Sequence, residues 1–379
     1  MPDSLLRSKF VALDSSHLIK VVRDTFSSDL AQRQKAAAFE CAFESSGSVL
    51  LLSWHHLQEL LSHENKTVIQ QRFEYIASKP MVASLKSLTD ASVVGGIIDV
   101  QAMEVAAAFN GPGLTLTGVR DIAAAGMFTL GSGSDIVRPF KDTWSPVSEG
   151  FARQGQRHRE IVAISRSDFA GVGHLKVADL LNQAARSPEE AAQRLGQMNV
   201  RLEKDIQTRG DKRIRNPAQT SRAFIEGVAR MGSEVARGPH PVLQILSMIG
   251  VDRSEIGPET TIDDLGRLST FRKKLETVNR LLGFPFQDLK AKVTGERLPS
   301  SVIQAAVEEF RPDTPEWKGS DLPDSYLATL SAYADVTFVD KRTHEALRQA
   351  RPKLPELAAI LKRVEKAGDY SAIARIVLG

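Results

Sequence analysis

The sequence lacks several features that would directly indicate the structural or functional class of the protein. Its 379 residues include one cysteine, Cys41, so an internal disulfide framework is excluded, and no Cys/His spacing resembles a structural zinc site. No segment reaches the roughly 18 apolar residues of a membrane span, and the N-terminus lacks the apolar run of a signal peptide. We therefore expect a soluble, cytoplasmic protein with no membrane partner.

The chain also has little excess of positive over negative charge. The formal net charge is +3, which is too small to prove a nucleic-acid partner and does not oppose one. With 42% hydrophobic and 25% charged residues, the chain has an ordinary globular composition and is long enough for two or more cores. Disorder is therefore a poor default for this protein.

Strand-like and helix-like patterns alternate over residues 1–110. The apolar runs that predict strands lie at residues 9–13, 48–53 and 95–100. Each run is followed by a helical pattern, with Ser15 or Ser16 as the expected N-cap after the first strand and Ser53 after the second. This alternation predicts an α/β fold in which helices cover both faces of a parallel sheet, giving three layers.

The pattern changes at residue 111 and returns near the C-terminus. Residues 111–317 begin with a Gly/Ser/Thr-rich stretch and are then mainly helical. From residue 318 a helical segment, the apolar run VTFV (336–339) and a last helical stretch (354–378) follow. The sequence therefore predicts one α/β domain, formed by residues 1–110 and 318–379, that a large helical insertion interrupts.

Acidic residues cluster at the predicted strand ends. Asp14 comes directly after the first strand, Asp340 directly after VTFV, and Glu59 lies on the helix behind the second strand. The carboxyl ends of parallel strands meet at one edge, which is where open α/β sheets bind ligands. Asp321 and Asp324, three residues apart, share one side of the first turn of a predicted helix. We expect these five acids to converge.

Five converging carboxylates would repel one another and raise one another's pKa. Mg²⁺ or Mn²⁺ would offset that repulsion, because hard cations prefer carboxylate oxygen, water and phosphate as ligands. The simpler interpretation is that each aspartate only caps a helix and that Glu59 is a solvated helix residue. The combination of acids after separate apolar strands favours the metal site.

Three blocks of the sequence resemble PIN-like domains, a family with a metal-dependent nuclease fold. The blocks are FVALDSSHLIKVV, VLLLSWHHLQELL and DSYLATLSAYADVTFVD, and the resemblance covers about residues 1–110 and 318–350. In that family an acid ends the first strand, a glutamate stands six residues after the serine that closes the second, an aspartate opens an Ala-rich helix, and a last acid follows the next strand. The matching positions here are Asp14, Glu59, Asp324 and Asp340. Asp321 has no firm counterpart.

The resemblance implies an endonuclease, acting on RNA in preference to DNA, in which Mg²⁺ or Mn²⁺ activates a water nucleophile. Asp14, Glu59, Asp324 and Asp340 would be the catalytic metal ligands, and Asp321 an additional ligand or a residue behind them. Basic and hydroxyl groups near the same edge would hold the phosphates of the substrate. These expected substrate-binding residues are Ser15, Ser16, His17, Lys341 and Arg342.

Other functions remain open from the sequence. A haloacid-dehalogenase-like phosphatase also has an aspartate after its first strand, but it needs a second acid two residues later, where this chain has Ser16. A non-catalytic PIN-like protein that binds nucleic acid or acts as a scaffold is the stronger alternative. The helical insertion carries a basic segment at residues 208–215, which could steer nucleic acid, and the insertion could equally hold a protein partner or form a homo-oligomer.

Overall fold

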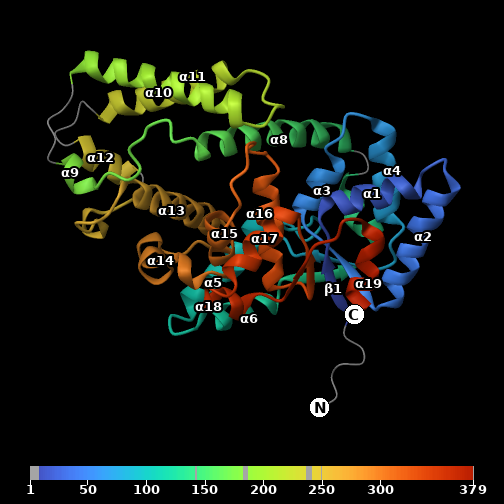
Figure 1. Cartoon of the computed structure of the whole chain (residues 1–379). Helices are drawn as coiled ribbons and strands as arrows, with labels where there is room; N and C mark the ends of the chain where they lie inside the picture. Colours follow the sequence, from blue (N-terminus) through green and yellow to red (C-terminus); the bar gives the residue numbers. More distant parts are fainter. Residues whose placement is uncertain (1–7, 141–142, 182–186, 236–240, 249, 379) are drawn as a thin grey trace. The chain divides into compact units, whose positions relative to one another are not determined.

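The structure is a computed structural model that describes residues 8–140, 143–181, 187–235, 241–248 and 250–378. The chain divides into two compact units. Residues 1–154, 278–313 and 322–379 form the first, and residues 155–277 and 314–321 form the second. In the first unit the helix α19 (Ile373–Leu378), red in Figure 1, packs against the blue α2 (Leu30–Ser45). Segments from both ends of the chain therefore belong to one unit.

A six-stranded sheet forms the centre of the first unit within the described residues. Its strands are β1 (Lys9–Ala12), β2 (Ser48–Leu52), β3 (Val82–Leu85), β4 (Phe128–Gly131), β5 (Val336–Phe338) and β6 (Arg363–Glu365). Their order is β4-β3-β2-β1-β5-β6, and every neighbouring pair is parallel except β3 and β4. Val11 lies opposite Leu50 on one side and Val336 on the other. The predicted α/β class with a largely parallel sheet is confirmed.

Alternating side chains of the strands build two apolar layers, because successive residues of a strand point to opposite faces. Val11 and Leu50 join the core under α1 (Ser15–Thr25), α2 and α4 (Lys66–Ala77). Ala12 and Leu51 join the core under α5 (Ile97–Asn110), α15 (Pro299–Glu309) and α18 (Pro355–Ile360). All five residues of β2 are buried. Helices therefore cover both faces, as expected for a parallel sheet.

The strand order reverses direction at β1. The chain runs outward from β1 to β2 and β3 on one side, and from β5 to β6 on the other. In open parallel sheets such a reversal leaves a crevice beyond the carboxyl ends of the central strands. Here α1 follows β1, and α17 (Lys341–Ala350) follows β5. The carboxyl ends of β1 and β5, with the helix N-termini behind them, are therefore the place to look for a site.

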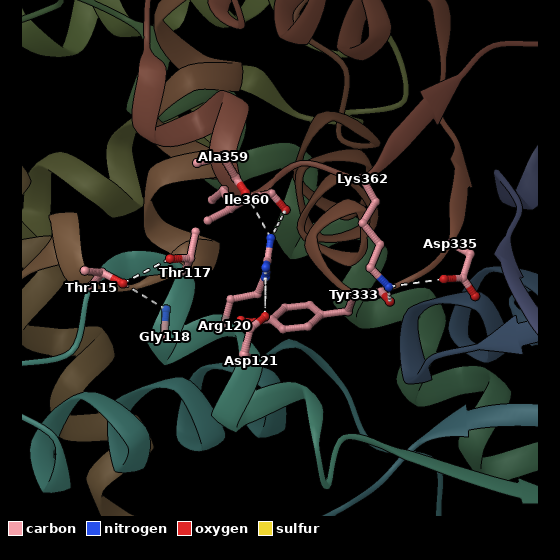
Figure 2. Close-up of polar contacts among 10 residues, drawn as sticks. All are labelled: Thr115, Thr117, Gly118, Arg120, Asp121, Tyr333, Asp335, Ala359, Ile360 and Lys362. Carbon is pink, nitrogen blue, oxygen red and sulfur yellow. Dashed lines mark hydrogen bonds and ion pairs between the residues drawn. The ribbon is translucent and has the colours of Figure 1, made fainter. Parts of the chain in front are cut away.

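Hydrogen bonds and one ion pair hold the opposite, amino-terminal edge of the sheet together. The carboxylate of Asp335, just before β5, accepts a hydrogen bond of 2.9 Å from the backbone N–H of Phe10 in β1. Figure 2 shows Lys362, just before β6, between Asp335 and the carbonyl of Tyr333, with its Nζ 3.2 Å from Asp335 Oδ1. In the same view Arg120 donates to the carbonyls of Ala359 and Ile360 at the end of α18. The polar side chains at this edge therefore have hydrogen-bond or ion-pair partners within the protein.

The other helices of the first unit are α3 (Trp54–Leu61), α6 (Leu116–Ala124), α7 (Gly133–Val137) and α14 (Phe286–Lys292). The chain passes between the units within α8 (Trp144–Arg166), α13 (Ile262–Leu282) and α16 (Asp321–Thr329), and once more between Asp313 and Thr314. The segment expected as an insertion, residues 111–317, thus contributes to both units, since β4, α14 and α15 belong to the first.

The second unit consists mainly of helices in its described part. They include α9 (Val177–Leu181), α10 (Pro188–Arg209), α11 (Pro217–Val235) and α12 (Pro241–Met248). In Figure 1 α10 and α11 lie side by side, and Leu202, Ile206 and Ile225 bury their side chains between them and α8. No helix in the described part of the chain is long and apolar enough to cross a membrane.

Three local predictions were wrong. Residues 95–100 do not form a strand: Gly96 caps α5, and the Asp99 carboxylate accepts a 2.8 Å hydrogen bond from the Gly96 N–H. The strand at this point in the chain is β3, four residues that had no predicted structure. The expected C-terminal helical stretch contains β6. Finally, Asp14, rather than Ser15 or Ser16, is the N-cap of α1.

Candidate metal centre

A small hollow opens beside the carboxyl ends of β1 and β2 in the first unit. Its volume is about 10 Å³, close to the space that one water molecule needs. Its walls come from α1, the end of β2, α3 and the start of α16. The lining residues are Ser15, Ser53, His55, His56, Glu59, Pro323, Asp324 and Leu327. Two of the predicted metal ligands, Glu59 and Asp324, therefore face the same small space although they lie far apart in the sequence.

His56 joins the two strand ends beneath this hollow. Its Nδ1 accepts a 3.0 Å hydrogen bond from the backbone N–H of Ser53, so the ring proton must be on Nε2, which donates to the Leu13 carbonyl at 2.8 Å. Burial lowers the pKa of His56, against the raising effects of the Leu13 carbonyl and the Asp14 charge. His56 is therefore neutral, and its two hydrogen bonds fix the position of Leu13, and with it the next residue, Asp14, relative to β2.

Three influences act on the pKa of Glu59, and together they raise it. Burial raises its pKa, the hydrogen bond from the Ser15 side chain lowers it, and the negative charge of Asp14 raises it again. A carboxyl group in this environment holds its proton to a higher pH than usual unless a cation arrives. The Asp14 charge therefore reaches Glu59, although Asp14 does not line the hollow.

Asp14 also has a structural role. Its Oδ1 accepts a 2.7 Å hydrogen bond from the backbone N–H of Ser16, which caps the first turn of α1, and only 8% of the residue is exposed. Such a bond uses one of the roughly four lone-pair positions of a carboxylate. Capping and cation binding are therefore compatible at this residue.

Asp340 caps α17 in the same way. Its carboxylate accepts hydrogen bonds from the backbone N–H groups of Thr343 (2.9 Å) and Arg342 (3.2 Å), and the Arg342 guanidinium lies 3.3 Å away. Burial opposes the shift, but these hydrogen bonds and the Arg342 charge hold the pKa of Asp340 below its usual range. Asp340 does not line the hollow, and Arg342 already balances its charge. Lys341 is exposed.

Asp321 belongs to the second unit. Its Oδ2 lies 2.7 Å from Nη1 of Arg166 in α8, and the side chain is 2% exposed. A buried carboxylate with a guanidinium partner has its negative charge compensated within the protein. The structure thus gives Asp321 a partner that the sequence did not indicate, 155 residues away.

The expected substrate-binding residues differ in their surroundings. Ser15 lines the hollow, and Ser16 is exposed. His17 is 4% exposed, and its Nε2 lies 3.0 Å from the carbonyl of Ala367, to which it donates. In the second unit Arg209 stacks on Trp317 and Arg213 pairs with Asp211 at 2.7 Å, so two cations of the basic segment 208–215 have internal partners.

The donor set fits a hard divalent cation to a limited degree. Glu59, Asp324, Ser15 and Ser53 are the lining residues with side-chain oxygen; His55 and His56 line the hollow as well, and no Lys or Arg does. No group of three or more His, Cys, Asp or Glu side chains in the described residues is placed as a metal cluster. Mg²⁺ commonly takes only one or two carboxylates and fills its other positions with water and substrate phosphate. Two lining carboxylates are therefore sufficient for such a cation.

The sequence interpretation missed Ser53 and His56 as site residues. Ser53 was expected only as a helix cap, and His56 was assigned no role. The signal was their spacing: a residue at the third helical position can bond back to the cap residue, as His56 does here. The bond from His56 to Leu13 joins two strands and has no signal in the local sequence.

Comparisons with family models, curated proteins and solved structures gave no match for this chain. Its function therefore has to be argued from the site itself.

Proposed function

We propose that the protein is a divalent-metal-dependent endonuclease of PIN-like type that hydrolyses phosphodiester bonds, with RNA as the favoured substrate. One observation carries the proposal. Glu59 and Asp324, brought from distant parts of the chain, line one hollow at the edge where the strand order reverses, with the charge of Asp14 beside them. Two acids that line one hollow with no lysine or arginine among the lining residues are suited to a cation.

In this proposal each residue has a distinct task. Glu59 and Asp324 hold Mg²⁺ or Mn²⁺ directly, and Asp14 contributes charge or a water-mediated contact. When bound, the ion would polarise the scissile phosphate and lower the pKa of a coordinated water. Ser15 orients Glu59 through its hydrogen bond, and His56 keeps the ends of β1 and β2 in register.

The remaining predicted residues act outside this first set. Asp340 positions the N-terminus of α17 and, with it, the exposed Lys341, whose charge would attract the substrate phosphates; Arg342 would reach a phosphate only by giving up its ion pair with Asp340. Ser16 has an exposed side chain close to Asp14 in the sequence, and its hydroxyl would contact the phosphate backbone of the substrate. We assign Asp321 to its ion pair with Arg166 and not to the cation.

The test is cleavage of labelled single-stranded and double-stranded RNA and DNA by the purified protein, with Mn²⁺, Mg²⁺ or EDTA. We expect cleavage of RNA with either metal and none in EDTA. Asp324→Asn and Glu59→Gln should each lower the rate by about 100-fold or more, since each removes a ligand of the ion. Asp90→Asn and Glu64→Gln are matched controls, because both parent residues are exposed and neither lines the hollow.

Wild-type rates in both hollow variants, or cleavage that persists in EDTA, would refute the proposal. Metal-dependent RNA binding without cleavage would instead identify the non-catalytic alternative, a nucleic-acid-binding or scaffold protein.

A further inference from the structure

A second and much larger cavity lies in the first unit, and it shares no lining residue with the hollow. Its volume is about 300 Å³, at the lower end of the range for small-molecule sites. It lies between β2, the residues on either side of β1, α1, α2 and the end of α4. Its apolar wall includes Leu18, Phe39, Phe43, Val49 and Leu50. A space of this size and character is suited to a ligand with an apolar body.

Three polar groups meet at the wall of this cavity. One oxygen of the Glu40 carboxylate accepts a hydrogen bond from the Tyr75 hydroxyl, and the other forms an ion pair with Lys79. The Lys79 Nζ also lies 4.4 Å from the centre of the Tyr75 ring. The side chains of Glu40 and Lys79 are 21% and 12% exposed. The one ammonium group of the cavity wall is therefore already engaged twice.

A second carboxylate leaves the cavity with a net negative charge. Glu44 stands one helical turn after Glu40 on α2, so both lie on the same side of that helix, and both line the cavity. Within the described residues Glu44 forms no ion pair, and its side chain is exposed. Two carboxylates face one lysine, so the wall has a formal charge of −1. Charge complementarity therefore favours a cationic ligand.

We propose that this cavity binds a small apolar primary amine, with its hydrocarbon body against the Leu/Val/Phe wall and its ammonium group between Glu40 and Glu44. The aromatic faces of the wall add to the attraction for a cation. An anionic ligand of the same shape would face two carboxylates and would need to displace Glu40 from Lys79. This site is independent of the proposed nuclease centre.

The test compares three ligands that share one body: octylamine, 1-octanol and octanoate. Binding to the full-length protein would be followed by calorimetry at pH 7 and by the methyl resonances of ¹³C-labelled methionine. Met81 lines the cavity and is 46% exposed, whereas Met127 is fully buried in the core of the other face. We expect octylamine to bind about fivefold or more tightly than 1-octanol, octanoate to bind most weakly, and Met81 alone of the two to shift.

Glu44→Gln supplies the charge control without risk to the fold, because the side chain is exposed. It should weaken octylamine binding about two- to fivefold and leave 1-octanol unchanged, whereas Glu64→Gln, an exposed acid outside the cavity, should change neither. Equal affinity for octylamine and octanoate, or octylamine binding that leaves the Met81 resonance unmoved, would overturn the assignment.

Discussion

Glu59 and Glu104 are two acids of the same unit with raised pKa values, Glu104 fully buried and Glu59 half-buried, and they differ in their partners. The Glu104 carboxylate, fully buried on α5, accepts hydrogen bonds from the Ser300 N–H at 3.0 Å, the Ser300 hydroxyl at 2.5 Å and the Tyr333 hydroxyl at 2.6 Å. Glu59 faces a hollow, one serine and the charge of Asp14. A buried acid surrounded by neutral donors links helices together, whereas a half-buried acid beside a second acid is a candidate cation ligand.

The largest effect should come from breaking the Glu104 network. Glu104→Ala would leave the Ser300 N–H and the Tyr333 hydroxyl buried without an acceptor and would open a cavity among α5, α15 and the segment before β5. We expect a loss of about 3–5 kcal/mol in the free energy of unfolding. The matched change Glu59→Ala should lower the free energy of unfolding far less in the absence of metal, since it also removes the repulsion between Glu59 and Asp14. Urea unfolding of the two variants at pH 7 compares them, and equal losses would contradict the distinction.

Glu104 should also leave a signature in the pH dependence of stability. Burial raises its pKa from 4.5 to about 7, against the lowering effects of its hydrogen bonds from Ser300 and Tyr333. A group whose folded pKa is raised contributes stability below its unfolded pKa, and that contribution is lost as the pH rises through the folded pKa.

The wild-type protein should therefore lose up to about 3 kcal/mol between pH 4.5 and 7 through this one residue. Glu104→Gln, which carries no titratable proton, should lack this component. The measurement is the difference in unfolding free energy between wild type and variant across this pH range. A difference that does not vary with pH would show that Glu104 titrates normally.

The smallest expected effect concerns Glu59 itself. Without metal, Glu59→Gln should leave the stability unchanged or raise it by up to about 1 kcal/mol at pH 8, because the charge beside Asp14 disappears while the shape remains. With saturating Mn²⁺ the order should reverse, since the wild type gains binding energy that the variant lacks. Melting temperatures of the wild type and Glu59→Gln with and without Mn²⁺ measure the sign of the stability difference in each condition. A clear destabilisation of metal-free Glu59→Gln would assign this residue the structural role of Glu104.

The sequence predicted much of the central fold because its signals are local. The apolar runs that became β1, β2 and β5, the cap at Ser53 and the acids after the strands depend on near neighbours. Residues 97–100 were misread because Ile97 and Ile98 favour strands, while the bond from Gly96 to Asp99 and the buried helical face decided for a helix. The four-residue β3 and the three-residue β6 are too short to show a period.

The site was predictable only in part, for the same physical reason. Asp14, Glu59 and Asp340 follow strands, so their edge of the sheet could be inferred, and Asp324 lines the same hollow as Glu59. Whether an acid meets a cation or another acid depends on long-range packing. Arg166 reaches Asp321 from α8, and Arg342 turns back onto Asp340, and neither contact is visible in a one-dimensional pattern.

The central claim is that the hollow lined by Glu59 and Asp324 binds a divalent cation. Its most direct test is Mn²⁺ titration of the full-length protein, followed by electron paramagnetic resonance of the free ion, in the wild type, Glu59→Gln, Asp324→Asn and the control Glu64→Gln. The account predicts one site or two in the wild type and the control, a loss of affinity of about tenfold or more in each hollow variant, and tighter wild-type binding as rising pH removes the Glu59 proton. Undiminished Mn²⁺ binding in both hollow variants, or none in the wild type, would contradict it.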